Sequence, residues 1–297
     1  MNKVLVSGAT GFVGRYIVEG LLSAGHNVLA AGRTPPPVGL FSRPVEFEFL
    51  ALDPQRDQRR SFAGIDAFIH GAFDHVPGRY RGGEGEDPEG FRHRNFDGTV
   101  RLFEEAKAQG VRHTIFLSSR AVYDGIPKGT ALKEDMALSP SSLYGEVKLD
   151  AETALARLSS SDFATASLRL TGVYGDLRPN KWDGLFDNYR AGRPVPSRGG
   201  TEVHGRDVAS AVQVLLDTDT RQTNGQSFNV SDLLLDTRGI LERIPAPPGA
   251  VLPAAADTTS INIMDTQAIR SLGWRPGSEA LFAETISALA AGFSGSN

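Results

Sequence analysis

Tyr144 and Lys148 lie four residues apart at the start of a stretch, 144–158, whose apolar spacing is typical of a helix. Residues four apart lie on one face of a helix, so both side chains can point into one cleft. A phenol has an unperturbed pKa of about 10, but a cation within about 4–6 Å favours phenolate and lowers that pKa. With Lys148 as the cation, Tyr144 is predicted to exchange a proton with a carbonyl or alcohol oxygen. The alternative is a half-buried tyrosine on an amphipathic helix.

Gly8 and Gly11 follow an apolar run at 4–6, and Gly14 lies in the first turn of a helical pattern over 12–23. A strand that ends in a tight glycine turn and feeds into a helix leaves backbone N–H groups facing one point, where a pyrophosphate binds. Gly8 is expected to permit the turn, Gly11 the close approach of the phosphate, and Gly14 the packing of helix on strand. An ordinary strand–helix turn is the alternative, because glycines occur there at the same spacing.

Arg33 and Thr34 follow Gly32 at the end of a second predicted strand, 26–31, which closes a βαβ unit. The ribose of a bound dinucleotide lies at this place, where a carboxylate accepts from a 2′-OH and an arginine pairs with a 2′-phosphate. We therefore predict NADP(H) rather than NAD(H), with NAD(H) and an ordinary exposed arginine as the alternatives. Asp53, before Pro54 at the end of a third strand, is expected either to accept from adenine or to form a turn.

Four more apolar runs are predicted to add strands to the same sheet, at residues 65–72, 114–117, 167–173 and 228–230. The chain is therefore predicted to be an α/β protein with a doubly wound, mostly parallel Rossmann sheet of about seven strands. Residues 1–173 and 204–231 are expected to form the dinucleotide-binding domain, and residues 174–203 and 232–297 a small C-terminal substrate lobe. We expect a surface loop over 78–90 and a less regular, aromatic segment over 182–196.

Composition excludes several classes of function. A net charge of −4 without a long basic run argues against nucleic acid as a partner. The absence of cysteine excludes disulfides, thiolate metal sites and thiol catalysis, and the scattered histidines suggest no metal site. No export signal precedes the first apolar run and no later run has spanning length, so we expect a cytoplasmic protein without a membrane segment. A small molecule is the expected substrate.

Further motifs follow the glycine turn along the chain. They are Asn95-x-x-Gly98-Thr99, Ser118-Ser119-x-x-Val122-Tyr123, Tyr144-x-x-x-Lys148, Leu168-Arg169-x-x-Gly172-Val173-Tyr174-Gly175 and Leu272-Gly273-Trp274-x-Pro276. In this order they resemble the extended short-chain dehydrogenase/reductase family, the NAD(P)-dependent sugar epimerases, dehydratases and reductases. The resemblance covers nearly the whole chain.

The resemblance implies a catalytic set of Ser119, Tyr144 and Lys148. In this set Tyr144 is the acid/base, Lys148 tunes its pKa, and Ser119 forms a hydrogen bond with the reacting oxygen. Hydride then moves to or from the nicotinamide. It also implies that the cofactor-binding residues come from many parts of the chain. They are Gly8, Gly11, Phe12, Val13, Gly14, Arg33, Thr34, Asp53, Pro54, Gly71, Ala72, Asn95, Ser118, Tyr144, Lys148 and Thr171. A homodimer through helices at 96–108 and 144–158 is expected.

Two departures from the family pattern bear on the reaction. Family dehydratases place an Asp-Glu pair after the catalytic hydroxyl, whereas this chain has Arg120-Ala121, which disfavours dehydration. Nucleotide-sugar enzymes of the family carry an arginine where this chain has Gly200, and an acidic residue where it has Arg206. The sequence therefore predicts an oxidoreductase or epimerase for a sugar or other small carbonyl compound. The alternative is a non-catalytic NADP-bound sensor or scaffold.

Overall fold

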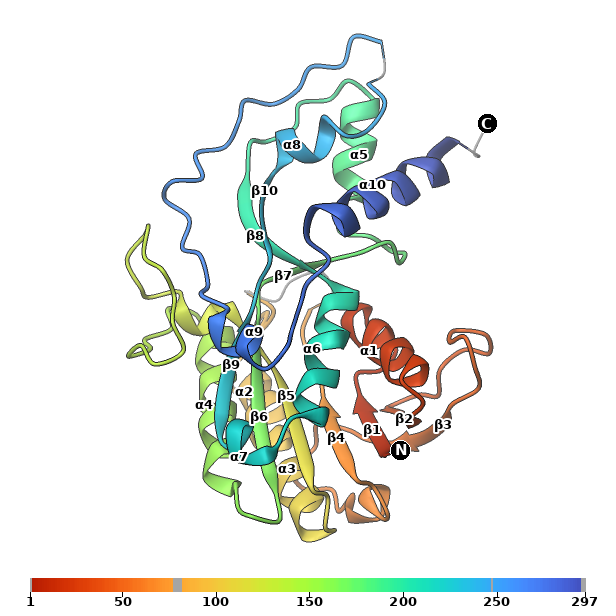
Figure 1. Ribbon diagram of the computed structural model, residues 1–297, viewed down its shortest axis with the longest axis vertical. Helices are drawn as coiled ribbons and strands as arrows, with labels where there is room; N and C mark the ends of the chain where they lie inside the picture. The colour runs from red at the N-terminus through yellow and green to blue at the C-terminus, as the bar shows by residue number, and fades with distance from the viewer. Residues whose placement is uncertain (1, 77–81, 247, 295–297) are drawn as a thin grey trace.

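Seven parallel strands form the central sheet, and helices cover both of its faces (Figure 1). The computed structural model describes residues 2–76, 82–246 and 248–294. The strand order β3-β2-β1-β4-β5-β6-β9 starts near the middle and extends in both directions, which confirms the doubly wound α/β fold. These strands are β1 Lys3–Ser7, β2 Asn27–Gly32, β3 Glu46–Phe49, β4 Ala67–His70, β5 His113–Ser119, β6 Ala164–Leu170 and β9 Gln226–Val230.

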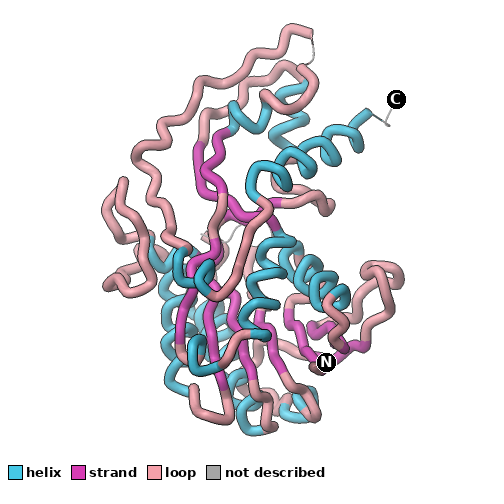
Figure 2. Tube along the Cα trace, in the orientation of Figure 1, coloured by secondary structure: helices cyan, strands magenta, loops and turns pink. Residues whose placement is uncertain are grey.

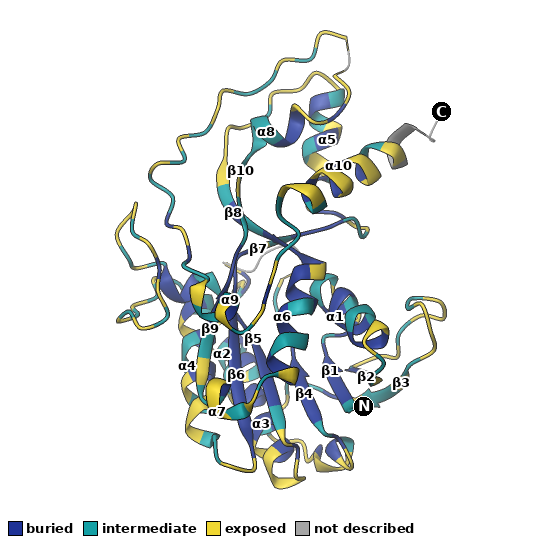
Figure 3. Cartoon of the chain, in the orientation of Figure 1, coloured by how far each residue is buried: buried dark blue, intermediate teal, exposed yellow. Residues whose placement is uncertain are grey.

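Two pairs of helices sandwich the sheet, with α1 against α6 on one face and α3 against α4 on the other. Their bounds are α1 Phe12–Ser23, α3 Gly98–Ala108, α4 Leu143–Leu158 and α6 Gly205–Asp217. Alternate residues of a strand point to opposite faces, so Val4 and Val6 pack beneath α1 and α6 while Leu5 packs beneath α3 and α4. Burial on both faces explains why β1, β2 and β4 are rich in apolar residues, whereas the edge strand β3 is partly exposed and alternates Glu with Phe (Figure 3).

Short helical elements connect the main ones. They are η1 Arg59–Phe62, α2 Pro88–Arg92, η2 His93–Asp97, η3 Arg120–Tyr123, α7 Thr220–Thr223 and α9 Gln267–Ser271. The π-helical η2 joins α2 directly to α3. Of the loop expected over 78–90, residues 78–81 lie outside the described residues. Helix α2 begins at Pro88, where the Asp87 side chain accepts from the Gly90 amide at 2.9 Å.

A second sheet of three strands lies beyond the carboxyl ends of the parallel strands (Figures 1 and 2). In it β8 Gly199–His204 pairs in parallel with β7 Gly172–Tyr174 and antiparallel with β10 Leu233–Asp236. Three helices accompany this sheet: α5 Asp183–Arg190, α8 Thr237–Leu241 and α10 Ser278–Ser294. An aromatic cluster that includes Tyr174 and Trp182, whose rings stack at 5.3 Å, forms the core of this part.

Two expectations from the sequence are wrong in detail here. Residues 167–173 do not form one strand, because the chain leaves the central sheet at Thr171, whose hydroxyl donates to the carbonyl of Thr201 at 2.7 Å. The segment 182–196 is not irregular throughout but contains α5. No pattern in the sequence predicted α6, β8 or β10. β8 opens on two glycines, which weaken the strand pattern.

Among the residues that the structure describes, no helix combines the length and apolar character that crossing a membrane requires.

Candidate functional site

Two adjoining cavities, of about 760 and about 520 Å³, lie at the carboxyl ends of the parallel strands. The glycine turn borders both, since Gly8, Gly11 and Gly71 line each of them. In open α/β sheets ligands bind in the crevice at this edge, where the strand order reverses. An extended ligand could therefore occupy both cavities and cross the glycine turn at its middle.

The glycine turn has no room for side chains. Gly8 has a φ of +72°, and a Cβ there would lie 2.7 Å from the carbonyl carbon of Gly71. A Cβ on Gly14 would lie 2.1 Å from the carbonyl oxygen of Gly8. Gly11 is the N-cap of α1 and provides no side-chain cap for the first amides of the helix, and Phe12 and Val13 both line the larger cavity. These features fit the pyrophosphate of a dinucleotide.

Lys148 is buried at the base of the larger cavity and tied to the sheet. Its ammonium donates to the carbonyl of Leu117 at 2.8 Å and lies 4.4 and 4.6 Å from the ring centres of Phe73 and Phe116. Burial lowers the pKa of Lys148 to about 7, although the charge of Glu152 opposes the shift. The charge on this lysine therefore changes near neutral pH when no ligand contacts it.

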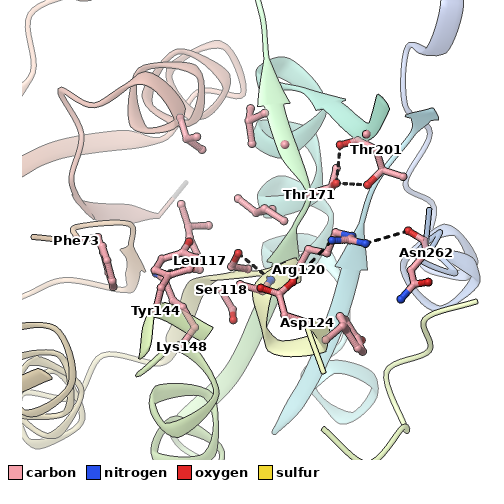
Figure 4. Close-up of a pocket in the computed structure, with 18 of the residues that line it drawn as sticks. Phe73, Leu117, Ser118, Arg120, Asp124, Tyr144, Lys148, Thr171, Thr201 and Asn262 are labelled. Carbon is pink, nitrogen blue, oxygen red and sulfur yellow. Dashed lines mark hydrogen bonds and ion pairs between the residues drawn. The ribbon is translucent and has the colours of Figure 1, made fainter. Parts of the chain in front are cut away.

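Tyr144 lines the same cavity, one helical turn before Lys148 (Figure 4). Ser142 caps α4 by accepting from the Gly145 amide at 3.2 Å, which places Tyr144 in the first turn of the helix. The ring of Tyr144 meets the ring of Phe73 edge to face at 5.2 Å, and the Lys148 ammonium lies 6.0 Å from its centre. The structure thus brings the two residues together as their spacing predicts.

Ser118 and Ser119, at the end of β5, complete this group. The Ser119 hydroxyl accepts from the amide of Ala121 at 3.1 Å, which leaves its own proton to donate to a ligand oxygen. The Ser118 hydroxyl is buried and has no hydrogen-bond partner among the described residues. Both serines line the larger cavity, so a polar ligand there would satisfy the Ser118 hydroxyl.

His70 belongs to a buried chain of hydrogen bonds that no pattern in the sequence predicted. Its ring joins the Ser7 hydroxyl, at 2.7 Å, to the Thr99 hydroxyl, at 3.0 Å. The Ser7 hydroxyl in turn accepts from the amides of Gly71 and Ala72, at 3.2 and 3.3 Å. Burial, with a smaller contribution from the charge of Lys148, lowers the pKa of His70 to about 3, so the ring is neutral. This chain fixes the backbone beside the glycine turn.

The smaller cavity is lined by Arg33 and Thr34 at the end of β2 and by Ala72 after β4. The Arg33 guanidinium lies 3.6 Å from the carboxylate of Asp74, which also accepts from Arg94 at 2.7 Å. Both arginines line this cavity. Arg94 also contacts the carboxylate of Asp87 at 3.3 Å, so two arginines and two carboxylates meet at this end of the cavity.

Asp53, Pro54 and Asn95 are not among the described residues that line either cavity. The Asp53 carboxylate accepts from the Gln55 amide at 3.0 Å and so forms the turn that the sequence left as an alternative. Asn95 is buried, and its amide group bonds the backbone of Asp74 and Phe91. The structure therefore places Asn95 behind the cavity wall, where it holds the backbone of Asp74.

The far side of the larger cavity combines one predicted site residue with residues that were not predicted to bind a ligand. Thr171, a predicted site residue, lines it together with Thr201. Below them, the Arg120 guanidinium donates to the Asn262 carbonyl at 3.3 Å and lies 3.9 Å from the carboxylate of Asp124 (Figure 4). The signal that could have identified Arg120 is its position directly after Ser119.

Across the described ranges, no group of three or more His, Asp or Glu side chains is arranged to hold a metal ion.

The chain is similar to known proteins over most of its length. A sequence model of the NAD dependent epimerase/dehydratase family matches residues 4–231. The chain is 26% identical to a UDP-glucose 4-epimerase of Lactobacillus helveticus, over 93% of each chain. It is 31% identical to a decarboxylating sterol-4-alpha-carboxylate 3-dehydrogenase of Mus musculus, over 65% of this chain and 51% of that one.

Among solved structures, MoeE5 in complex with UDP-glucose and NAD is similar to this chain with a TM-score of 0.76 and 25% identity, and the match covers 98% of this chain and 99% of MoeE5. The match extends through the sheet and the segments beyond it, as the resemblance of the sequence motifs predicted. The chain therefore belongs to the NAD-dependent epimerase/dehydratase family, enzymes of the extended short-chain dehydrogenase/reductase type that use a nicotinamide cofactor.

Proposed function

We propose that this protein is an NADP(H)-preferring oxidoreductase or epimerase that acts on the carbonyl or alcohol carbon of a sugar or another small molecule. The observation that carries the proposal is that Ser119, Tyr144 and Lys148 line the same cavity as the glycine turn. A group that exchanges protons beside a nicotinamide site is what carbonyl reduction and alcohol oxidation require. A sensor or scaffold that only binds the dinucleotide would have no need for this arrangement.

Each residue of this set has a role that its surroundings support. When bound, the nicotinamide accepts or donates the hydride. Tyr144 gives its proton to the carbonyl oxygen or takes one from the alcohol, and its place in the first turn of α4 favours phenolate. Lys148, whose ammonium lies 6.0 Å from the centre of the Tyr144 ring, is the cation proposed to tune that phenol and to hold the ribose of the bound cofactor. Ser119 donates its hydroxyl proton to the same substrate oxygen and holds it in place.

The preference for NADP(H) rests on the end of β2. Arg33 and Thr34 line the smaller cavity there, and β2 delivers no carboxylate at its end to accept from a ribose 2′-OH. The ion pair of Arg33 with Asp74 is long and the arginine side chain is 78% exposed, so a 2′-phosphate can replace it at little cost. MoeE5 was solved with NAD, and for this reason the preference needs its own test.

The substrate is proposed to be smaller than a nucleotide sugar. Gly200 lines the larger cavity without a side chain, and a Cβ there would meet nothing within 4 Å. Arg206 contacts Asp176 and Glu284 and is not among the described residues that line this cavity. Dehydration is not proposed, because the position after Ser119 carries Arg120, which cannot act as the acid or base of an elimination at neutral pH.

We further propose that residues 1–173 and 204–231 bind the dinucleotide, and that residues 174–203 and 232–297 provide the substrate lobe. Residues 199–201 and 260–262 of the proposed lobe line the larger cavity opposite the glycine turn of the proposed dinucleotide-binding domain, which supports this division. A cytoplasmic homodimer through the outer faces of α3 and α4, which pack side by side, completes the proposal. Light scattering of the purified protein tests the dimer, and a monomer at micromolar concentration would contradict it.

The function is tested by following reduced nicotinamide absorbance while sugars and small carbonyl compounds are added with NADPH or NADH. We expect turnover for some members of the panel, at least tenfold tighter binding of NADPH than NADH, and loss of that preference in Arg33→Ala.

Tyr144→Phe is expected to abolish turnover and to leave NADPH affinity nearly unchanged. Tyr189→Phe, which changes a buried tyrosine of the lobe, serves as the matched control. Conversion of the sugar without net change in the cofactor identifies an epimerase. Substantial turnover in Tyr144→Phe would refute the proposed role.

A further inference from the structure

Arg120 occupies a position in the larger cavity that the reaction chemistry described above does not use. It begins η3 directly after Ser119, and its side chain is 25% exposed. The carbonyl of Asn262 and the carboxylate of Asp124 hold its guanidinium against the cavity wall, beneath Thr171 and Thr201 (Figure 4). The chain therefore keeps a partly desolvated guanidinium beside the residue that bonds the reacting oxygen.

The charges around this cavity have an excess of cations. Arg120, Lys128 and Lys148 line it, whereas Asp124 is the one carboxylate among its described lining residues. The chain as a whole has a net charge of −4, so this cavity differs in sign from the protein around it. Lys148 is assigned to the acid/base group and helix α1 to the pyrophosphate, so Arg120 and Lys128 are the two lining cations without a role in the proposed reaction. A cleft with this excess attracts anions.

We propose that Arg120 binds a carboxylate or phosphate group on the reacting part of the substrate. The proposal rests on the proposed function, because it places the anion near the carbon whose oxygen meets Ser119 and Tyr144. A guanidinium matches a carboxylate or phosphate with two parallel N–H···O bonds, which orients the ligand as well as attracting it. The substrate class is then a sugar acid, a sugar phosphate or a small oxo or hydroxy acid, rather than a neutral sugar.

The test uses matched pairs of probes and the protein saturated with NADP⁺. Calorimetry compares glucuronate with glucose, galacturonate with galactose, and glucose 6-phosphate with glucose, and UDP is a separate probe. The variants are Arg120→Gln, which removes the charge, and Arg120→Lys, which keeps the charge but loses the paired geometry. Arg60→Gln, an exposed arginine on η1, is the matched control.

We expect at least one anionic probe to bind the wild type at least tenfold more tightly than its neutral partner. Arg120→Gln is expected to abolish that ratio, Arg120→Lys to keep part of it, and Arg60→Gln to leave it unchanged, while NADPH affinity stays constant in all four proteins. Preference for the uronates alone identifies a carboxylate, and preference for glucose 6-phosphate alone identifies a phosphate.

The proposal is overturned if the wild type shows no anion preference, if the preference survives in Arg120→Gln, or if only UDP binding depends on Arg120. The last result would assign the guanidinium to a nucleotide diphosphate. Because calorimetry needs no turnover, a failure of this proposal can be distinguished from a failure of the proposed function, which Tyr144→Phe tests.

Discussion

The ammonium of Lys148 donates to the backbone carbonyl of Leu117 at 2.8 Å. This bond joins α4, which carries Tyr144, to β5, which ends in Ser118 and Ser119. The lysine therefore fixes the distance between the proposed acid/base and the proposed oxygen-binding serine. Because the lysine is also buried, its pKa is lowered to about 7, and its charge depends on pH near neutrality.

Lys148 is expected to make stability depend on pH. Its pKa is about 7 in the folded protein, where burial lowers it, and about 10.4 in an unfolded chain. Between these values the unfolded chain binds more protons, so the free energy of unfolding rises with pH, by up to about 1.4 kcal/mol per pH unit. Urea denaturation at pH 7, 8 and 9 measures the slope, and Lys148→Met should lack this contribution. Equal slopes in both proteins would contradict the assignment.

Replacing His70 by leucine is expected to destabilise the protein by about 2–3 kcal/mol, because the Ser7 and Thr99 hydroxyls lose a buried partner. Cofactor affinity should fall as well, since Ser7 holds the amides of Gly71 and Ala72. Thr99→Val removes only the distant bond and should cost about 1 kcal/mol. Chemical denaturation and NADPH titration measure both effects. An unchanged affinity in His70→Leu would show that this chain of bonds does not position the cofactor.

Two glycines offer a matched comparison. A Cβ on Gly14 would approach the carbonyl oxygen of Gly8 to 2.1 Å, whereas a Cβ on Gly200 would meet nothing within 4 Å. Gly14→Ala is therefore expected to cost about 1–3 kcal/mol in stability and to weaken NADPH binding at least tenfold. Gly200→Ala should retain both properties. Calorimetric titration with NADPH gives the affinities, and tight binding by Gly14→Ala would argue against the pyrophosphate site.

The buried ion pair of Arg169 and Glu152, with an Nη2–Oε2 distance of 2.8 Å, is expected to be costly to break. Both side chains are nearly inaccessible, and Arg169 also donates to the Tyr123 hydroxyl at 2.7 Å. Glu152→Ala should lose about 3–5 kcal/mol because it leaves the guanidinium buried and uncompensated. The double variant Glu152→Leu with Arg169→Met should recover most of that loss. The midpoints of urea denaturation compare the variants. A double variant no more stable than Glu152→Ala would contradict this account of the ion pair.

Local patterns in the sequence predicted the parts of the site that depend on short spacings. The glycine turn lies within one strand–helix junction, and Tyr144 and Lys148 share one helical turn. Most strands of the central sheet gave apolar runs, and the edge strand β3 gave an alternating pattern, so all seven strands were predicted. These features depend on neighbours in the chain, which a single sequence shows.

Features that depend on distant partners could not be predicted in the same way. His70 meets Ser7 across 63 residues of sequence, and no local pattern marks that contact. Asn95 bonds the backbone of Asp74, 21 residues away, rather than pointing into a cavity. For a polar side chain, the choice between a ligand and the protein's own backbone is made by tertiary packing.

The segment after the second sheet returns to the first. Trp274 is fully buried within the core beneath α1 and α6, its indole donates to the Asp207 carbonyl at 2.9 Å, and the Asp207 carboxylate accepts from the Gly277 amide at 3.0 Å. The last part of the chain thus closes the core that the first part begins. Loss of this segment would expose that core. Because the same segment connects the two parts of the molecule, we expect the dinucleotide-binding and substrate-binding parts to unfold together in one cooperative transition.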